Sequence, residues 1–359
     1  MKKAIQTATI LLIIIYLFLI IFFSQEIATY ILNSIKSCIT IIIPSLYIFM
    51  IISDFIITSN IYVIFSKPFS FISRYVLKIP EQFFPIYIIS NIGGYPVGAK
   101  LITDMLKNNK IDRTTADDMM MYCYLSGPAF IFGIVGTNIF SDIKVGILIF
   151  TSIALSNFII AAIIGANHNI PELQKYIPEI RISIEELILS VYNGGKSILK
   201  ICAIIVFFSS IICIAENSGL ISILAKWIDY FAEFDYATAV ITIKTFIEIS
   251  NISLFTADLN NIPLITSLLS FGGICIILQV KSINSSLSLK RFLLFRIISM
   301  ILSYLICKLF YFITYDFLLP TYSPTHIVHG QKSPIITIFL LIMTILFLLK
   351  FSIEKEKKI

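Results

Sequence analysis

The sequence predicts an all-α, polytopic membrane protein, and three observations carry this prediction. Apolar residues make up 58% of the 359-residue chain and the mean hydropathy is +0.94, whereas soluble domains are about half apolar. Many continuous apolar runs reach the roughly 20 residues that cross a bilayer as a helix. Two runs are interrupted by polar residues, and the interruptions share a sequence motif. We therefore expect about eight transmembrane helices plus two re-entrant hairpins in an inverted repeat.

The apolar runs predict the spans in chain order. They are Ala4–Phe23, Ser37–Ile57, Met119–Ile139, Val145–Ile164, Ile198–Ile214, Ile262–Val280, Phe292–Phe312 and Ile335–Phe351. Two further segments, Ile61–Lys78 and Ile180–Val191, have the mixed composition of helices that lie in the membrane interface. Trp227, the only tryptophan, marks a third such segment at Gly219–Phe234, because tryptophan is enriched at the interface.

The stretch Ile89–Gly98, I-S-N-I-G-G-Y-P-V-G, interrupts the apolar run Phe83–Leu106, and Ala237–Leu259 is interrupted in a similar way. Each unpaired backbone group in hydrocarbon costs several kcal/mol, so such a break persists only where protein or water satisfies it. If both segments enter and leave on one side, most loop Lys and Arg residues gather on the side of the N-terminus. The positive-inside rule makes that side cytoplasmic. This pattern predicts two re-entrant hairpins and cytoplasmic N- and C-termini.

Two short motifs recur at one spacing. I-S-N-I begins at Ile89 and again at Ile249, and Lys-Ser occurs at Lys36 and again at Lys196, in both cases 160 residues later. Each predicted half has three full crossings, an odd number, so the halves have opposite orientations. Inverted repeats with broken helices are a transporter architecture that binds its substrate between the repeats. The predicted boundaries are 1–27 (N-terminal span), 28–166 (first Gate-like repeat, named for the resemblance below), 167–190 (cytoplasmic interfacial linker), 191–314 (second, inverted repeat) and 315–359 (outer loop, last span and charged tail).

Candidate solute-binding residues lie at the two predicted tips and at the breaks of the spans that follow them. Glycine permits close backbone approach, proline stops a helix, and a restarted helix presents free N–H groups to an anion or polar ligand. A carboxylate in an apolar segment is costly to bury and is a functional candidate by default. The candidates are Asn91, Gly93, Gly94, Tyr95 and Pro96 in the first tip, Glu248, Ser250 and Asn251 in the second, and Ser126, Gly127, Gly272, Gly273 and Gln279 on the walls.

Structural roles compete with these assignments. The first break can be a helix stop without a ligand, and the glycines can serve tight helix packing. Glu248 can pair with Lys244, four residues earlier on the same helix face. Lys36 and Lys196 near span ends are ordinarily explained by snorkelling to the interface, and Arg296 is a comparable single charge.

The sequence predicts no enzyme, cofactor, metal site or nucleic-acid partner. The six cysteines lie in apolar stretches without metal-site spacing. Gly194–Ser197 ends like a P-loop but lacks the first glycine and the strand of that motif. His326 and His329 have no acid or cysteine near them in sequence except Asp316, which makes a solvated loop the simpler interpretation. No nucleophile–base pair is evident.

Four stretches occur in an order that a known family shares. They are N-I-G-G-Y-P-V-G-A-K (Asn91–Lys100), S-G-P-A-F-I-F-G (Ser126–Gly133), F-I-E-I-S-N (Phe246–Asn251) and S-F-G-G-I-C-I-I-L-Q (Ser270–Gln279). Together they resemble the sporulation integral membrane protein YlbJ family, which carries the Gate, or nucleoside-recognition, domain. That domain is in turn similar to elements of concentrative nucleoside transporters and ferrous-iron transporters. The resemblance implies an endospore-forming bacterium and a role in spore formation, without establishing a substrate.

We therefore predict a sporulation-associated, transporter-like integral membrane protein that moves or binds a small polar or anionic solute between its repeats. The alternative is a non-transporting membrane scaffold for spore envelope or cortex assembly. An intramembrane enzyme or lipid translocase has less support, because no catalytic constellation is evident. The expected location is the cell membrane. The expected partners are the lipid bilayer, the solute, and a second copy of the chain or other sporulation membrane proteins.

Overall fold

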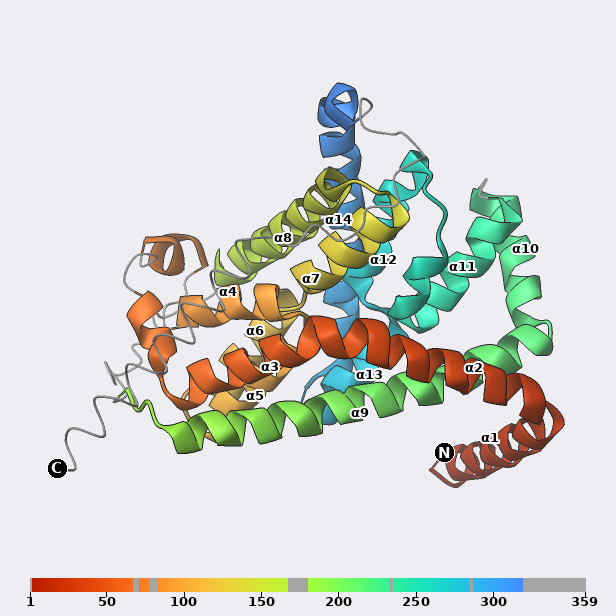
Figure 1. Ribbon diagram of the computed structural model, residues 1–359, viewed down its shortest axis with the longest axis horizontal. Helices are drawn as coiled ribbons and strands as arrows, with labels where there is room; N and C mark the ends of the chain where they lie inside the picture. The colour runs from red at the N-terminus through yellow and green to blue at the C-terminus, as the bar shows by residue number, and fades with distance from the viewer. Residues whose placement is uncertain are drawn as a thin grey trace. The chain divides into compact units, whose positions relative to one another are not determined.

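The computed structural model describes residues 2–66, 71–77, 83–166, 180–232, 235–284 and 287–318 (Figure 1). The chain divides into two compact units, Met1–Pro320 and Thr321–Ile359, and the described residues all belong to the first. Every regular element in these ranges is helical, which confirms the predicted all-α class. The predicted last span, Ile335–Phe351, most of the predicted outer loop and much of the predicted interfacial linker lie outside the described residues.

Among the described residues, five helical segments are long and apolar enough to cross a membrane, and each contains one predicted span. They are α2–η1–α3 (Ser24–Ser37, Cys38–Ile42 and Ile43–Thr58), α8 (Ile143–Ala166), α9 (Ile184–Asn217), η8–α12–α13 (Leu259–Asn261, Ile262–Phe271 and Gly273–Ile283) and α14 (Leu289–Leu318). The helix α1 (Lys2–Phe22) covers most of the first predicted span. The protein is therefore an α-helical, multi-pass membrane protein, and the total of eight spans stays a prediction.

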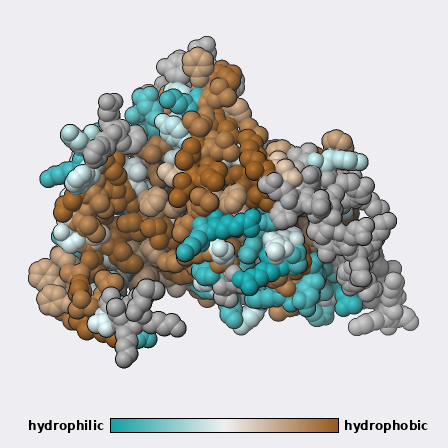
Figure 2. Space-filling view, turned by 180° about the vertical axis from the view of Figure 1, so that it is seen from behind, coloured by the Kyte–Doolittle hydropathy of each residue, from teal (hydrophilic) through white to brown (hydrophobic). Residues whose placement is uncertain are grey.

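Large apolar side chains are exposed along these helices. Leu199 and Phe207 of α9 are exposed, and α10 (Leu220–Ala232) exposes the aromatic rings of Trp227 and Tyr230. Figure 2 shows one face of the molecule, where apolar residues cover much of the described surface and hydrophilic residues gather in an area low in the view. Soluble monomers rarely expose apolar patches larger than a few hundred Å², so this surface suits contact with lipid.

The helix α9 is longer than the sequence predicted, because the expected interfacial helix Ile180–Val191 and the expected span Ile198–Ile214 largely merge into one helix. The Ser183 side chain caps it by accepting a hydrogen bond from a backbone N–H of the first turn at 3.1 Å. At Gly194, a Cβ would lie 2.9 Å from Ile51 Cγ1 of α3. This glycine lets α9 lie close against α3, and the two helices run side by side in Figure 1. The boundary predicted at residue 190 thus falls inside a continuous helix.

The first interrupted segment folds into two α-helices joined by one glycine. They are α4 (Phe84–Gly93) and α5 (Tyr95–Lys107), and Gly94 between them has φ +90°, a conformation that favours glycine. A Cβ at Gly98 would lie 2.9 Å from Ser90 Cβ, although eight residues of straight helix rise about 12 Å. The chain therefore turns back on itself at the predicted tip.

The second interrupted segment has a different local structure. The helix α11 (Tyr236–Ile247) begins at Asp235, whose carboxylate accepts from a first-turn N–H at 3.1 Å. The chain then leaves through the 3-10 helix η7 (Ile249–Leu254) and an extended stretch. No glycine and proline restart an α-helix here, in contrast to Gly93–Pro96 of the first tip. Glu248 instead caps η7. The position of either tip within a bilayer stays a prediction.

Both spans that follow the tips are broken where the sequence indicates breaks. The helix α6 (Arg113–Tyr122) ends before a non-helical stretch, and α7 (Pro128–Phe130) with η6 (Ile131–Ile139) continues the segment. The helices α12 and α13 meet at Gly272 and Gly273, whose φ values are +84° and +81°. Two successive residues in the left-handed region require glycine for an unstrained backbone.

The order of elements recurs along the chain. The first series is α2–α3, the short helices η2 (Ile61–Phe65) and η4 (Ile72–Leu77), α4–α5, α6–η6 and α8. The second series is α9, α10, α11–η7, α12–α13 and α14. The helices α8 and α14 pack against each other and against α12 of the second broken segment. The recurrence is consistent with the predicted repeat, whose boundaries and opposite orientations stay predictions.

The turn at Gly94 leaves no room for a side chain at Gly98. A Cβ there would lie 2.5 Å from the Cys123 carbonyl oxygen and close to Ser90, whereas a Cβ at Gly133 would meet nothing within 4 Å. We expect Gly98→Ala to destabilise the purified protein by about 1–3 kcal/mol, as overpacking does. Gly133→Ala is the matched control and should be neutral or slightly stabilising. Thermal unfolding in detergent measures both, and equal melting temperatures for the two variants would contradict the hairpin packing.

Candidate functional site

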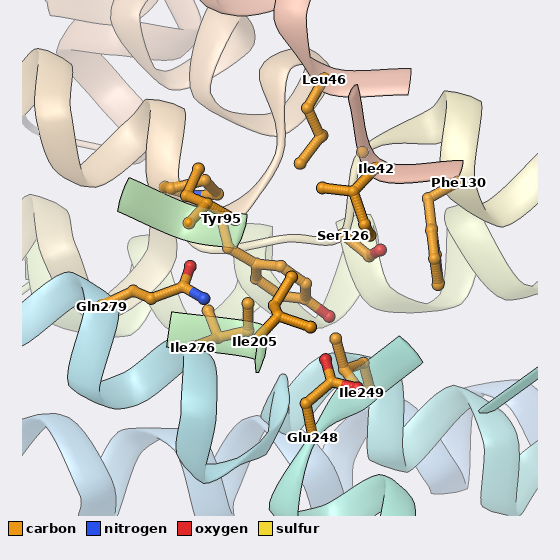
Figure 3. A pocket seen from close by; sticks show the side chains of 13 residues that line it. Ile42, Leu46, Tyr95, Ser126, Phe130, Ile205, Glu248, Ile249, Ile276 and Gln279 are labelled. Atoms are coloured by element: carbon orange, nitrogen blue, oxygen red, sulfur yellow. The ribbon is translucent and has the colours of Figure 1, made fainter. Parts of the chain in front are cut away.

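A small buried cavity lies where the two tips meet the two broken segments (Figure 3). Its volume is about 40 Å³ and most of its walls are apolar. A water molecule needs about 10–15 Å³ of such volume, so in this conformation the cavity admits water but not a metabolite. The lining residues are Ile42, Leu46, Tyr95, Pro96, Ser126, Gly127, Phe130, Ile201, Ile205, Glu248, Ile249, Ile276 and Gln279.

The cavity brings together predicted site residues from all four predicted elements. Tyr95 and Pro96 come from the first tip, Glu248 comes from the second, and Ser126, Gly127 and Gln279 come from the walls. The remaining candidates do not line it, namely Asn91, Gly93, Gly94, Ser250, Asn251, Gly272 and Gly273. Six of the thirteen predicted candidates therefore lie around one cavity and seven do not line it, and a role for any of them in binding a solute stays a prediction.

Two glycines outside the cavity, Gly94 and Gly273, serve close backbone packing. A Cβ at Gly94 would lie 3.1 Å from the backbone nitrogen of Gly127, so the first tip rests on the break of the span that follows it. A Cβ at Gly273 would lie 3.2 Å from the carbonyl oxygen of Thr245 and 3.4 Å from that of Phe246, so the end of α11 rests on the second break. At these positions the packing role, left open by the sequence, is the one that the contacts support.

Glu248 is 3% exposed, and its own turn holds its carboxylate. One oxygen accepts from the Ser250 N–H at 3.1 Å, and the other accepts from Asn251 Nδ2 at 3.3 Å and from the Ser250 hydroxyl. The alternative pairing with Lys244 is wrong, because Lys244 Nζ donates to Glu216 at 2.6 Å. Within the described structure no cation contacts Glu248, which leaves a carboxylate on the cavity wall held by hydrogen bonds alone.

Two buried amides keep an oxygen atom without a partner in the described structure. Asn91 Nδ2 donates to the Tyr87 carbonyl at 2.8 Å, and Gln279 Nε2 donates to Cys275 Sγ at 3.4 Å. Asn91 Oδ1 and Gln279 Oε1 are buried and unpaired, at a cost of about 1–3 kcal/mol each. Gln279 lies on the cavity wall opposite the Glu248 side (Figure 3), and its unpaired oxygen is itself buried.

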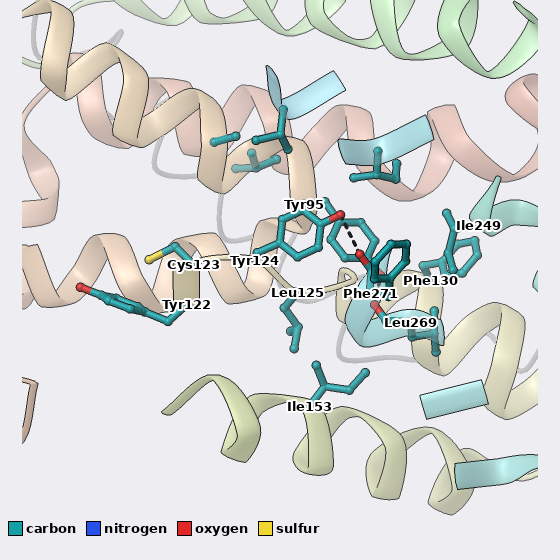
Figure 4. Packing of buried hydrophobic residues seen from close by; sticks show 14 of the residues in the cluster. Tyr95, Tyr122, Cys123, Tyr124, Leu125, Phe130, Ile153, Ile249, Leu269 and Phe271 are labelled. Carbon is teal, nitrogen blue, oxygen red and sulfur yellow. Dashed lines mark hydrogen bonds between the residues drawn. The ribbon is translucent and has the colours of Figure 1, made fainter. Parts of the chain in front are cut away.

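Side chains remote in sequence satisfy the carbonyl groups next to each break. The Tyr95 hydroxyl donates to the Leu269 carbonyl, and the Tyr124 hydroxyl donates to the Phe271 carbonyl at 3.2 Å. Figure 4 shows both rings beside the end of α12, with their centroids 4.6 Å apart. A helix break in a membrane protein requires such donors, because no water is present in hydrocarbon.

Arg296 of α14 donates hydrogen bonds to the backbone carbonyls at the first break. Its side chain is fully buried, and its guanidinium donates to the Met121 carbonyl and to the Tyr124 carbonyl at 3.3 Å. Asn157 Nδ2 donates to the Tyr124 carbonyl as well, at 2.8 Å. The guanidinium also lies over the Tyr124 ring, 4.5 Å from the ring centroid, a favourable cation–π geometry.

Sequence analysis missed most of these supporting residues. Arg296 carried a signal, since an ionisable residue within a span is costly, but nothing showed which carbonyls it would meet. Tyr124 and Asn157 carried none. A larger cavity of about 380 Å³ adjoins the small one and shares Pro96 and Gln279 with it. Within the described residues, no group of three His, Cys, Asp or Glu side chains could hold a metal ion.

The fold and the cavity define a class: a multi-pass, α-helical membrane protein with a buried cavity at the meeting point of broken helices. Over 128 residues the chain is 30% identical to the sporulation integral membrane protein YlbJ of Bacillus subtilis (strain 168). The match covers 33% of this chain and 29% of that protein, so the chain matches less than a third of the relative's length. No protein-family model and no solved structure matches the chain. The predicted similarity to Gate domains and nucleoside transporters stays a prediction.

The hydrogen bond from Tyr124 to the Phe271 carbonyl can be tested by removing one oxygen atom. We expect Tyr124→Phe to destabilise the protein by about 1–3 kcal/mol, because it leaves a buried carbonyl without a donor. Tyr192→Phe is the matched control, since Tyr192 is 67% exposed. Thermal unfolding of both variants gives the comparison, and an unchanged midpoint for Tyr124→Phe would show that the break is satisfied in another way.

Proposed function

We propose that this protein is a sporulation-associated membrane protein that binds and moves a small polar or anionic solute between its two halves. The observation that carries the proposal is the convergence of both tips and both breaks on one cavity, with Tyr95, Ser126, Glu248 and Gln279 on its walls. Paired broken helices that meet at a central cavity are the arrangement by which secondary transporters bind solutes. The name of the Bacillus subtilis relative supports the association with sporulation.

The cavity offers both signs of partial charge to a solute. The helix α5 begins at its wall, at Tyr95, and the N-terminus of a helix carries about half a positive charge. The Glu248 carboxylate lies on the other side. The Gln279 amide can donate and accept. A polar solute with separate donor and acceptor groups would find a partner for each.

The present conformation is a closed one in this proposal. A cavity of about 40 Å³ holds water only, so a solute enters when the first tip and the second tip separate. The hinge for such a motion is the single residue Gly94, whose backbone joins α4 and α5. The larger adjoining cavity gives the approach from one side.

The small size of the cavity also favours a second candidate, a membrane scaffold that does not transport. In that function the broken helices are structural, and the protein recruits partners for spore envelope or cortex assembly. The close packing of Gly94 on Gly127 and of Gly273 on α11 fits a static role. The two functions differ in their dependence on polar cavity residues, which a genetic test separates.

We expect Glu248→Gln to abolish function in a spore-forming host that lacks its own copy of the gene. This variant keeps an acceptor for the Ser250 N–H and removes the charge, so the turn can fold. Asn91→Ala, which removes the buried amide of the first tip, should also impair function. Glu26→Ala, at an exposed position of α2, is the control and should behave like the wild type.

The measurement is the yield of heat-resistant spores at equal membrane levels of each variant. Loss of spores with Glu248→Gln alone or with both tip variants supports solute binding at the tips. Normal spore yield from both tip variants refutes the site and leaves the scaffold function as the explanation of any deletion phenotype.

A further inference from the structure

The larger cavity is basic, and no assigned role accounts for its charge. It has a volume of about 380 Å³, within the range of cavities that hold small ligands, and it lies among α3, α5, α9 and α13. Four lysines line it, Lys100 and Lys107 from α5 and Lys196 and Lys200 from α9. Asp104 is the one acidic residue of the lining. We call this the basic cavity.

One of the four lysines is already neutralised and fixed. Lys100 Nζ forms a salt bridge with Asp54 of α3, and the other Asp54 oxygen accepts from Asn193 Nδ2 at 3.1 Å. This network joins α3, α5 and α9 at the wall of the cavity. It holds Lys100 and Asn193 in place before any ligand arrives, which lowers the entropy cost of binding.

The other lysines leave an excess of positive charge. Lys200 Nζ donates to the Ser282 carbonyl at 3.4 Å, a neutral partner, and Lys196 has no hydrogen bond or ion pair in the described structure. Lys107 has Asp104 one turn earlier on α5 as its nearest acid. Four lysines against Asp54 and Asp104 leave two positive charges without a counterion.

The spacing on α9 makes this excess unfavourable for the protein alone. Lys196 and Lys200 are four residues apart on one face of α9, and like charges at that spacing destabilise a helix by a few tenths of a kcal/mol. The side chains of Lys107, Lys196 and Lys200 are solvent-exposed, and a cleft lined by charges of one sign raises the local concentration of counterions. An anion bound there relieves the repulsion between Lys196 and Lys200.

We propose that the basic cavity binds a small solute through a doubly negative, phosphate-type group. Lys196, Lys200 and Lys107 contact its oxygens, and Lys100, Ser197 and Asn193 complete the wall. Lysine binds phosphate as a flexible point charge with three donors, and charge-assisted hydrogen bonds of this kind are about twice as strong as neutral ones. Binding here is independent of transport, so it stands even if the tips move no solute.

The test uses the purified full-length protein in a neutral detergent with inorganic phosphate and pyrophosphate as probes. Both anions should raise the melting temperature with concentration, because a ligand that binds only the folded state stabilises it. Sodium chloride at the same ionic strength should not, since screening weakens charge-based binding. Titration calorimetry then gives the affinity.

The double variant Lys196→Gln, Lys200→Gln should bind pyrophosphate about tenfold more weakly or worse, as loss of two charge-assisted contacts implies. The control is Lys36→Gln, Lys308→Gln, which removes the same charge at exposed positions of α2 and α14 and should leave the affinity unchanged. Equal loss of affinity in the two double variants overturns the proposal. So does a wild type that responds neither to the two probes nor to the anionic lipid in the experiment described next.

A second arm distinguishes a free solute from a lipid headgroup. The protein is placed in nanodiscs of phosphatidylcholine, with or without phosphatidylglycerol. Stabilisation by phosphatidylglycerol that requires Lys196 and Lys200 and competes with pyrophosphate identifies the headgroup as the natural source of the phosphate. Binding of pyrophosphate that phosphatidylglycerol leaves unchanged identifies a soluble solute. Normal spore yield from both tip variants, together with intact pyrophosphate binding, would reject the proposed function and leave the basic cavity as a binding site.

Discussion

The structure depends on how the carbonyl groups beside its helix breaks find donors. Around α12 they are supplied from the other end of the chain, by Tyr95 to Leu269 and by Tyr124 to Phe271. Around the first break the donor comes from the C-terminal part of the described chain, since Arg296 of α14 donates to two carbonyls there. In hydrocarbon each unmet carbonyl costs several kcal/mol. Each break can therefore exist only because elements distant in sequence pack beside it, and neither broken segment is stable without its partner.

Two kinds of contact surround the cavity: close backbone packing and hydrogen bonds from tyrosine side chains. Each tip lies backbone to backbone on the break that follows it, Gly94 on Gly127 and α11 on Gly273, so each tip and its broken segment form one unit. The bonds that cross between these units are made by Tyr95 and Tyr124. Tyrosine hydroxyls can exchange one acceptor for another or for water at a net cost of about 1 kcal/mol. Exchange of these two hydrogen bonds is what separation of the units in the proposed function would require.

The helices and their breaks could be predicted from the sequence because their signals are local. Apolar runs of sufficient length and residues such as Gly94, Pro96 and Gly272 act on their own segments. What could not be predicted depends on which helices meet. One of the two interpretations of Glu248 paired it with Lys244. In the structure α11 ends at Ile247 and Glu248 caps η7, while Lys244 donates to Glu216 of α9. The basic cavity is a similar case, because its lysines come from two helices whose proximity no local pattern reveals.

The two cavities place opposite charges on either side of Gln279, which lines both. A doubly negative group is favoured among Lys107, Lys196 and Lys200, but at the tips it would face the Glu248 carboxylate. Two like charges 4 Å apart repel by about 4 kcal/mol at an effective dielectric constant of 20, so an ionised Glu248 disfavours an anionic group in the tip cavity. A solute that uses both cavities would therefore keep its anionic end among the lysines and present a neutral polar end to Tyr95 and Glu248. Passage of the anionic end would require Glu248 to bind a proton or a cation, so the charge of Glu248 decides whether the tips admit the whole solute or only its polar end.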